Sequence, residues 1–137
     1  MGVERMTDTP RASSAAETSY QRIRIQVGSQ SFSAHLEDNS TTRDLVSLLP
    51  LAVAFHDFGG QEKLTPLPRK LDVSGMPKGD RAPAGDISYY SPTGSLVLYY
   101  RDVGYWDGIV RLGRLDDQLT VIAGLPDGLQ AIVERME

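Results

Sequence analysis

The chain has 137 residues, of which 40% are hydrophobic and 23% charged, and its formal net charge is −4. A chain of this length fits one domain with a single core. The acidic balance leaves no basic surface for nucleic acid or an anionic membrane, so we expect neither partner. Cysteine is absent, which excludes disulfides and thiolate chemistry and fits a reducing cytoplasm. With two histidines in addition, the sequence predicts no metal site and no cofactor.

Residues 1–19 are rich in Ser, Thr, Ala and charged residues and have neither helical nor strand periodicity. They predict a disordered N-terminal tail, followed by one domain over residues 20–137. Polar residues interrupt each apolar stretch that could begin a secretory signal. No later apolar run approaches the roughly 20 residues that span a bilayer. We therefore expect a soluble protein that is neither exported nor embedded in a membrane.

Two early segments alternate apolar and polar residues, which is the period of a half-buried strand. They are residues 22–27 and 31–37, and Gly28-Ser29 supplies a turn between them. The pair predicts a β-hairpin.

A short helix is predicted directly after this hairpin. Thr41 and Asp44 have the spacing of a capping arrangement, and Pro50 ends the helical segment. Leu45, Leu48 and Leu49 share one helical face, so we expect the helix to cover an open end of a sheet.

The middle of the chain mixes strand and loop signals. Residues 51–55 alternate as a third strand, and residues 63–65 form a short extended piece. Pro66 and Pro68 then argue against a central strand, because proline cannot donate to a ladder. Residues 69–85 predict one long surface loop, which is a candidate rim or lid.

The second half predicts further strands. Tyr105 and Trp106 are expected in a turn, and Gly113 indicates a bulge, a bend or a close backbone approach. Asp116 and Asp117 can cap a short helix that runs to Ala123. The strands are residues 87–90, 95–101, 109–115 and 129–134, with a terminal helix as the alternative for the last segment. Many strands with two short helices predict an all-β fold, either a barrel or a sandwich.

Three sequence runs resemble those of bacterial cyclophilin-like domains of unassigned function. The runs are Ser47-Leu48-Leu49-Pro50-Leu51, Gly85-Asp86-Ile87-Ser88-Tyr89-Tyr90 and Arg111-Leu112-Gly113-Arg114-Leu115. The resemblance covers about residues 22–136. It implies a closed or nearly closed cyclophilin-like β-barrel with small helices at its ends, and it does not by itself imply a function.

Cyclophilin isomerases carry a Phe-His-Arg run, whose arginine pulls on the twisting amide nitrogen of the substrate. This chain has Phe55-His56-Asp57 instead. A carboxylate cannot supply that hydrogen-bond donor, so prolyl isomerase activity is not expected. His56 with Asp57 has two interpretations: a general base with its orienting carboxylate, or a solvated strand end, which the missing metal spacing favours.

Aromatic residues suggest a ligand pocket, because tyrosine and tryptophan offer apolar faces together with a polar tip. Tyr89 and Tyr90 must point to opposite faces of a strand, as must Tyr99 and Tyr100, so half of this set is barrel core. Arg111 is either aimed at an anionic ligand or, on an exposed face, a surface charge that Asp86, Asp102 or Asp107 can pair with. The candidate ligand-binding residues are Phe55, His56, Tyr89, Tyr99, Trp106 and Arg111.

Three functional hypotheses follow from these residues. The leading one is a binding module for a small molecule or peptide, which the absent catalytic motifs favour over an enzyme. The second is a divergent prolyl isomerase or another enzyme that uses His56 and Asp57. The third is an interaction domain in which an exposed edge, Ile23 to Val27, pairs with another chain. The sequence does not indicate the oligomeric state.

Overall fold

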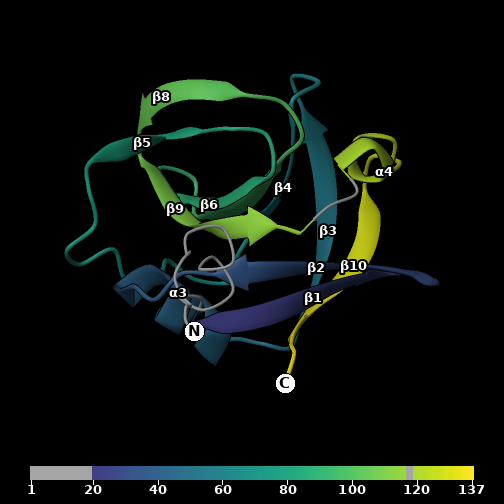
Figure 1. The fold of residues 1–137 in the computed structure, drawn as a ribbon, viewed down its shortest axis with the longest axis horizontal. Helices are drawn as coiled ribbons and strands as arrows, with labels where there is room; N and C mark the ends of the chain where they lie inside the picture. Colours follow the sequence, from purple (N-terminus) through teal and green to yellow (C-terminus); the bar gives the residue numbers. More distant parts are fainter. Residues whose placement is uncertain (1–19, 117–118) are drawn as a thin grey trace, which may run out of the picture.

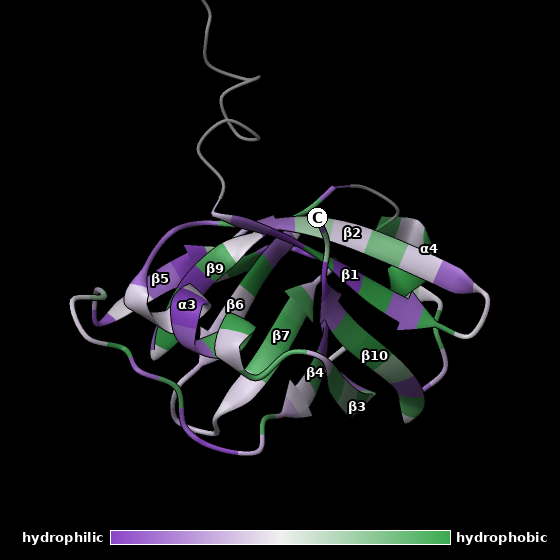
Figure 2. Cartoon of the chain, turned by 90° about the horizontal axis from the view of Figure 1, so that it is seen from below, coloured by the Kyte–Doolittle hydropathy of each residue, from purple (hydrophilic) through white to green (hydrophobic). Residues whose placement is uncertain are grey.

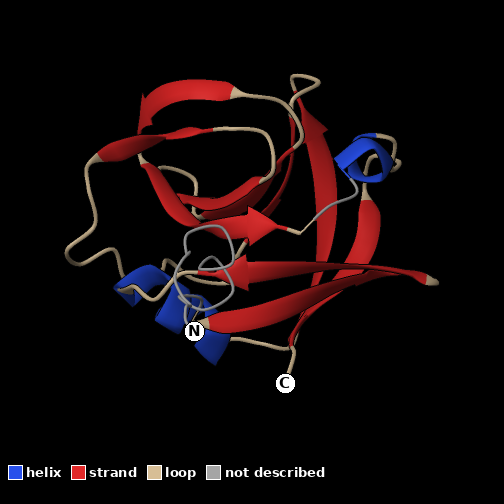
Figure 3. Ribbon diagram, in the orientation of Figure 1, coloured by secondary structure: helices blue, strands red, loops and turns tan. Residues whose placement is uncertain are grey.

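The computed structural model describes residues 20–116 and 119–137, so the predicted tail and Asp117 of the predicted cap lie outside the described residues (Figure 1). The fold is mostly strands with two short helices (Figure 3), as the sequence predicts. A closed antiparallel barrel has the strand order β1-β10-β3-β4-β7-β6-β9-β2. Its strands are β1 (Gln21–Val27), β2 (Gln30–Leu36), β3 (Leu51–Phe58), β4 (Glu62–Pro66), β6 (Asp86–Tyr90), β7 (Ser95–Tyr99), β9 (Ile109–Leu115) and β10 (Leu129–Arg135).

The barrel interior is filled by every second residue along the strands, whose side chains point inward. Ile23, Ile25 and Val27 point inward from β1, and Phe32 from β2 joins them in one buried cluster. The predicted hairpin of β1 with β2 is confirmed, and β6 forms a second antiparallel hairpin with β7. The alternation sets the direction of each side chain because successive residues of a strand point to opposite faces.

Closure of the barrel leaves β1 without a free edge. Its residues pair with β2 on one side and with β10 on the other, where Ile23 is opposite Arg135 and Ile25 is opposite Val133. The hypothesis that the edge Ile23 to Val27 pairs with another chain is therefore wrong, since its backbone groups are already used.

Strand β4 corrects another prediction. It lies between β3 and β7 in the barrel wall, although Pro66 had argued against a central strand. Pro66 is the last residue of β4, where a missing N–H group interrupts little of the ladder.

A two-stranded sheet lies beside the barrel, where the sequence predicted a loop and a turn. Strand β5 (Gly79–Ala82) falls inside the predicted loop 69–85, and β8 (Val103–Asp107) contains Tyr105 and Trp106. The two strands pair with each other, and we call them the flap. Gly79 permits their close approach, because a Cβ there would lie 2.4 Å from the Trp106 carbonyl oxygen.

The flap packs on the outer face of the barrel. Ala82 from β5 and Val103 from β8 form a second buried cluster with Val97, Tyr99 and Ile109 of the barrel wall. Strand β7 is consequently covered on both faces, and Figure 2 shows it as hydrophobic over most of its length. This second cluster forms the base of the site described below.

Helix α3 (Ser40–Ser47) begins where the sequence predicts but is capped differently. Its N-cap is Asn39, whose side chain accepts a hydrogen bond from the Thr42 N–H. In return, the Asn39 N–H donates a hydrogen bond to the Thr42 hydroxyl, which completes a capping box. Leu45 is buried against the interior cluster, while Leu48 lies beyond the helix end and packs at the cluster's margin. Helix α4 (Leu119–Ala123) is far from α3 (Figure 1), and neither described helix is long and apolar enough to cross a membrane.

Candidate functional site

A pocket of about 290 Å³ lies on the outer face of the barrel, beside the flap. Its volume is at the lower end of the range of small-molecule sites, which is roughly 300–1,000 Å³. We call it the outer pocket. It is lined by Phe58, Gln61, Glu62, Tyr90, Tyr99, Val103, Trp106 and Ile109.

Three of these residues form a row across adjacent barrel strands. Glu62 on β4 is directly opposite Phe58 on β3 and directly opposite Tyr99 on β7. Residues paired in this way point to the same face, with Cβ atoms roughly 4.5–5.5 Å apart. The register of the barrel therefore places one carboxylate between two aromatic rings.

The Glu62 carboxyl group is partly withdrawn from water. Burial raises its pKa above the ordinary value, and the nearby charge of Asp57 adds to the rise, while Gln61 opposes it. In the part of the chain that the structure describes, Glu62 forms no ion pair with Lys, Arg or His. Its negative charge is thus uncompensated at the wall of the pocket.

Tyr99 forms the buried floor, with 2% of its surface exposed. Its hydroxyl accepts a hydrogen bond of 2.8 Å from Ser88 Oγ on the neighbouring strand β6. Burial raises the pKa of Tyr99 to about 12, and the charges of Glu62 and Asp86 contribute to the rise. The phenol is therefore neutral at neutral pH and offers a ring face and a fixed polar tip.

The rim is aromatic and open to solvent. Trp106 on the flap is 61% exposed, and Phe58 at the end of β3 is 59% exposed. Large apolar side chains left this exposed beside a cavity are typical of a contact surface for a ligand or partner. Tyr105, the neighbour of Trp106, is similarly exposed but does not line the pocket.

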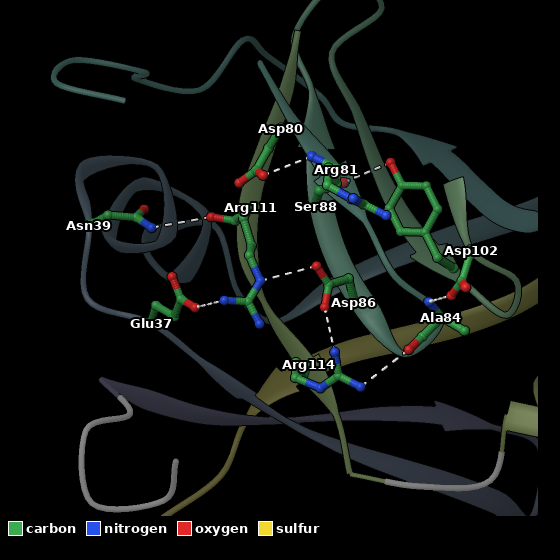
Figure 4. Close-up of polar contacts among 11 residues, drawn as sticks. Glu37, Asn39, Asp80, Arg81, Ala84, Asp86, Ser88, Asp102, Arg111 and Arg114 are labelled. Atoms are coloured by element: carbon green, nitrogen blue, oxygen red, sulfur yellow. Dashed lines mark hydrogen bonds and ion pairs between the residues drawn. The ribbon is translucent and has the colours of Figure 1, made fainter. Parts of the chain in front are cut away.

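Arg111 lies outside the pocket, in the polar network that Figure 4 shows. Its Nε donates to Asp86 Oδ2 at 3.0 Å, and its Nη1 contacts Glu37. Arg114 donates to the other Asp86 oxygen at 2.7 Å. Both arginines are paired with carboxylates, and Asp86 is one of the three aspartates that the surface interpretation of Arg111 names.

A β-bulge brings these two arginines to one carboxylate. Ile87 is opposite Gly113 while Ser88 is opposite Arg111, so Leu112 is the extra residue on β9. The bulge turns Arg111 and Arg114 to the same outer face. Gly113 also approaches β2 closely, since a Cβ there would lie 2.0 Å from the His35 carbonyl oxygen. The predicted bulge or close approach at Gly113 is confirmed, and the bulge places Arg111 on the opposite face from Leu115.

Asp86 is the centre of this network and is almost fully buried. Burial raises the pKa of its carboxyl group, and the charges of Arg111 and Arg114 oppose that rise. Ser88, two residues along β6, connects the same outer face to the Tyr99 hydroxyl.

Two predicted site residues belong to the barrel interior. Phe55 and Tyr89 are both buried in the interior cluster, on the opposite face of the wall from Tyr99. The Tyr89 hydroxyl accepts a hydrogen bond of 3.0 Å from the Leu71 N–H. Phe55 borders a space of about 10 Å³, which is no larger than one water site. The prediction that these residues share one cleft with Trp106 and Arg111 is therefore wrong.

His56 and Asp57 point to different surroundings. His56 is exposed, with Nδ1 3.7 Å from Asp127 Oδ2. Asp57 accepts a hydrogen bond from the Tyr100 hydroxyl and lies 3.3 Å from Lys63 Nζ. The Tyr100 hydrogen bond holds the pKa of Asp57 below its ordinary value, and Lys63 acts in the same direction. Among the described contacts, none joins the His56 and Asp57 side chains to each other.

Of the candidate residues, Tyr99 and Trp106 meet in the outer pocket. Sequence reasoning missed Phe58, Glu62 and Ile109, and Lys63 explains part of the failure. Lys63 is 4% exposed and points into the barrel, where Nζ donates to the Leu125 carbonyl oxygen at 2.8 Å. A charged residue such as Lys63 is normally assigned to the solvent face of a strand. Because Lys63 instead points inward, its neighbour Glu62 points outward to the outer pocket. The alternation within residues 62–66 was the available signal.

The described residues contain no group of three or more His, Asp or Glu side chains that could hold a metal ion. The outer pocket itself offers one carboxylate, which is fewer ligands than a structural or catalytic metal needs.

Comparisons with known proteins agree with the fold. The solution structure of the hypothetical protein AF2241 from Archaeoglobus fulgidus superposes with a TM-score of 0.64 at 18% sequence identity, covering 87% of this chain and 96% of that one. A comparison with curated proteins gives no match. The model of the Cyclophilin-like family matches residues 25–134. The chain therefore belongs to the Cyclophilin-like family.

Proposed function

We propose that this protein is a ligand-binding module without prolyl isomerase activity, and that its ligand occupies the outer pocket. The observation that carries the proposal is a preformed aromatic cavity whose rim residues Phe58 and Trp106 are more than half exposed. Such residues are costly to leave in water unless a partner covers them. The cavity walls come from rigid barrel strands and the flap, which limits the ordering cost of binding.

The position of Asp57 supports the absence of isomerase activity. Its carboxylate is held by Tyr100, Lys63 and the Gly60 N–H, and it has no proton to donate to a prolyl nitrogen at neutral pH. His56, the preceding residue, is exposed to solvent near Asp127. Neither residue lines the outer pocket.

Trp106 is the single tryptophan of the chain, so its fluorescence reports directly on the rim of the outer pocket. We would screen small molecules and peptides by Trp106 emission and by thermal stabilisation. A ligand at 100 times its Kd stabilises the folded state by about 2.7 kcal/mol. The expected result is at least one compound that changes both signals.

Matched substitutions locate the binding site. Trp106→Ala and Phe58→Ala should each weaken the thermal stabilisation, because both remove a rim contact. Tyr105→Ala is the control, since Tyr105 is 57% exposed on the same strand but does not line the pocket. A screen without any stabilising compound, or stabilisation that survives both rim substitutions, would contradict the proposal.

A further inference from the structure

The outer pocket has an unusual chemical balance. Four of its lining residues are aromatic, Phe58, Tyr90, Tyr99 and Trp106, and the one charged lining residue is Glu62. No basic side chain is among the described residues that line it. Aromatic ring faces are electronegative, so they attract a cation as the carboxylate does.

The position of Glu62 within the pocket strengthens this point. Its cross-strand partners are Phe58 and Tyr99, so two aromatic side chains flank the carboxylate on the same face. Glu62 is half-buried and has no ion-pair partner among the described residues. A partly desolvated charge of this kind is stabilised most by a ligand of the opposite charge.

Other classes of occupant fit the pocket less well. An anion would face Glu62, with the carboxylate of Asp57 close enough to affect the Glu62 pKa. A neutral apolar group would bury Glu62 further without compensation. A bare divalent metal ion would find one carboxylate where it needs several oxygen ligands.

We propose that the outer pocket binds an alkylammonium group, with Glu62 as its counter-ion and the rings of Phe58, Tyr90, Tyr99 and Trp106 as its walls. This inference rests on the proposed function, since it names the ligand class of the same pocket. The cation lies over ring faces on the floor and rim, and its substituents displace water from Val103 and Ile109. Recognition of quaternary ammonium by aromatic rings is strong when the site is shielded from water.

Choline and its neutral carbon isostere, 3,3-dimethylbutan-1-ol, test the requirement for charge. The two molecules have nearly the same shape and differ in the positive charge. Titration followed by Trp106 emission should show choline binding at least about tenfold more tightly, which corresponds to about 1.4 kcal/mol. Equal affinity for both would overturn the cation assignment while leaving a ligand pocket in place. A response to neither compound would also overturn the cation assignment. The proposed function would then be tested by the broader screen of small molecules and peptides.

A pair of substitutions tests the role of Glu62. Glu62→Gln keeps the size of the side chain and retains Trp106 as reporter, and it should reduce choline affinity by about tenfold with little effect on the neutral isostere. Asp107→Asn is the control, because it removes the same charge from the flap at a residue that pairs with Lys78 and does not line the pocket. Equal losses in the two variants would mean that the overall negative field, and not Glu62, attracts the cation. Unchanged affinity in Glu62→Gln would remove Glu62 from the site.

Discussion

Glu62 and Tyr99 are directly opposite each other on β4 and β7, and they meet at the wall and floor of one pocket. Burial raises the pKa of Glu62, and burial together with the Glu62 charge raises the pKa of Tyr99 to about 12. The pair therefore presents one titratable carboxylate beside one permanently neutral phenol in the physiological range.

We expect ammonium binding to weaken as the pH falls from 7. Burial raises the Glu62 pKa, so this carboxylate takes up a proton at a higher pH than an exposed glutamate, whose pKa is about 4.3. Below the Glu62 pKa, protons compete with the cation, and affinity should fall towards that of Glu62→Gln, about tenfold below the native value, and then level off. Choline titrations across this range, followed by Trp106 emission, measure the effect.

The titratable groups that interact with the Glu62 charge are Asp57 from β3, Tyr99 from β7 and Tyr100 directly after β7, and Tyr90 from β6 lines the same pocket. Asp57 stays charged in this window because its pKa is lowered, chiefly by the Tyr100 hydrogen bond, and tyrosines titrate far above it. Glu62→Gln should therefore give a flat profile. A profile in that variant as steep as in the native chain would assign the titration to another group.

Gly113→Ala should destabilise the fold through backbone contact. The added Cβ would lie 2.0 Å from the His35 carbonyl oxygen, so β9 must move away from β2 or lose its bulge. Overpacking of this kind costs about 1–3 kcal/mol. Urea unfolding should show a lower midpoint with an unchanged slope. Gly104→Ala is the control, because a Cβ there meets nothing within 4 Å; equal losses in the two variants would contradict this account.

Asp44 should contribute to stability above about pH 4 and lose that contribution in acid. It accepts hydrogen bonds from Arg69 at 2.7 and 3.0 Å and from the Asp72 N–H at 2.7 Å, joining α3 to the segment after β4. The Arg69 hydrogen bond lowers the pKa of Asp44 in the folded state. A carboxyl group with a lowered folded pKa stabilises the protein above its unfolded pKa and stops doing so as the pH falls through the folded value.

Asp44→Asn should therefore lower the urea midpoint at neutral pH and reduce its fall between about pH 5 and pH 2. Asp38→Asn removes an exposed pair with Arg43 on the same helix and serves as the control. An acid limb as steep in Asp44→Asn as in the native chain would show that other groups set the acid stability.

We expect no prolyl isomerase activity in assays on a panel of X-Pro peptides. Asp57→Arg should not create it, and should lower stability, because the new arginine would lie beside the buried ammonium of Lys63 and lose the Tyr100 hydrogen bond. Turnover in the native chain would refute the interpretation of Asp57. Activity in the variant alone would show that the missing arginine is the determining difference.

The sequence predicts the barrel hairpins because their side chains alternate strictly. β1 and β2 place Ile23 and Phe32 inward by period alone, and a glycine turn joins them. The strands of the flap were not predicted, for a physical reason. Gly79 to Ala82 has no apolar alternation, and its partner β8 is distant in sequence, so its strand form depends on tertiary packing.

The site was predicted in part for similar reasons. Tyr99 and Trp106 were chosen by residue type, and the structure brings them together. Phe55 and Tyr89 were chosen by the same criterion, but the choice of face that makes them core depends on the closed barrel. The bulge at Leu112 reverses the face of Arg111, and the inward Lys63 reverses the expected faces of β4. The bulge arises from contacts between distant strands and leaves no periodic signal, whereas the alternation of residues 62–66 is present in the sequence but does not say which face is interior.

The two apolar clusters of the fold lie on opposite faces of a shared wall, one inside the barrel and one beneath the flap. Substitutions in the flap and rim leave the interior side chains in place, because successive residues of the shared strands point to opposite faces. Ligand preference can therefore diverge among descendants of this chain while the barrel is inherited intact. Substitutions on the outer face of the barrel wall can change specificity, while the residues on its inner face are selected separately for stability.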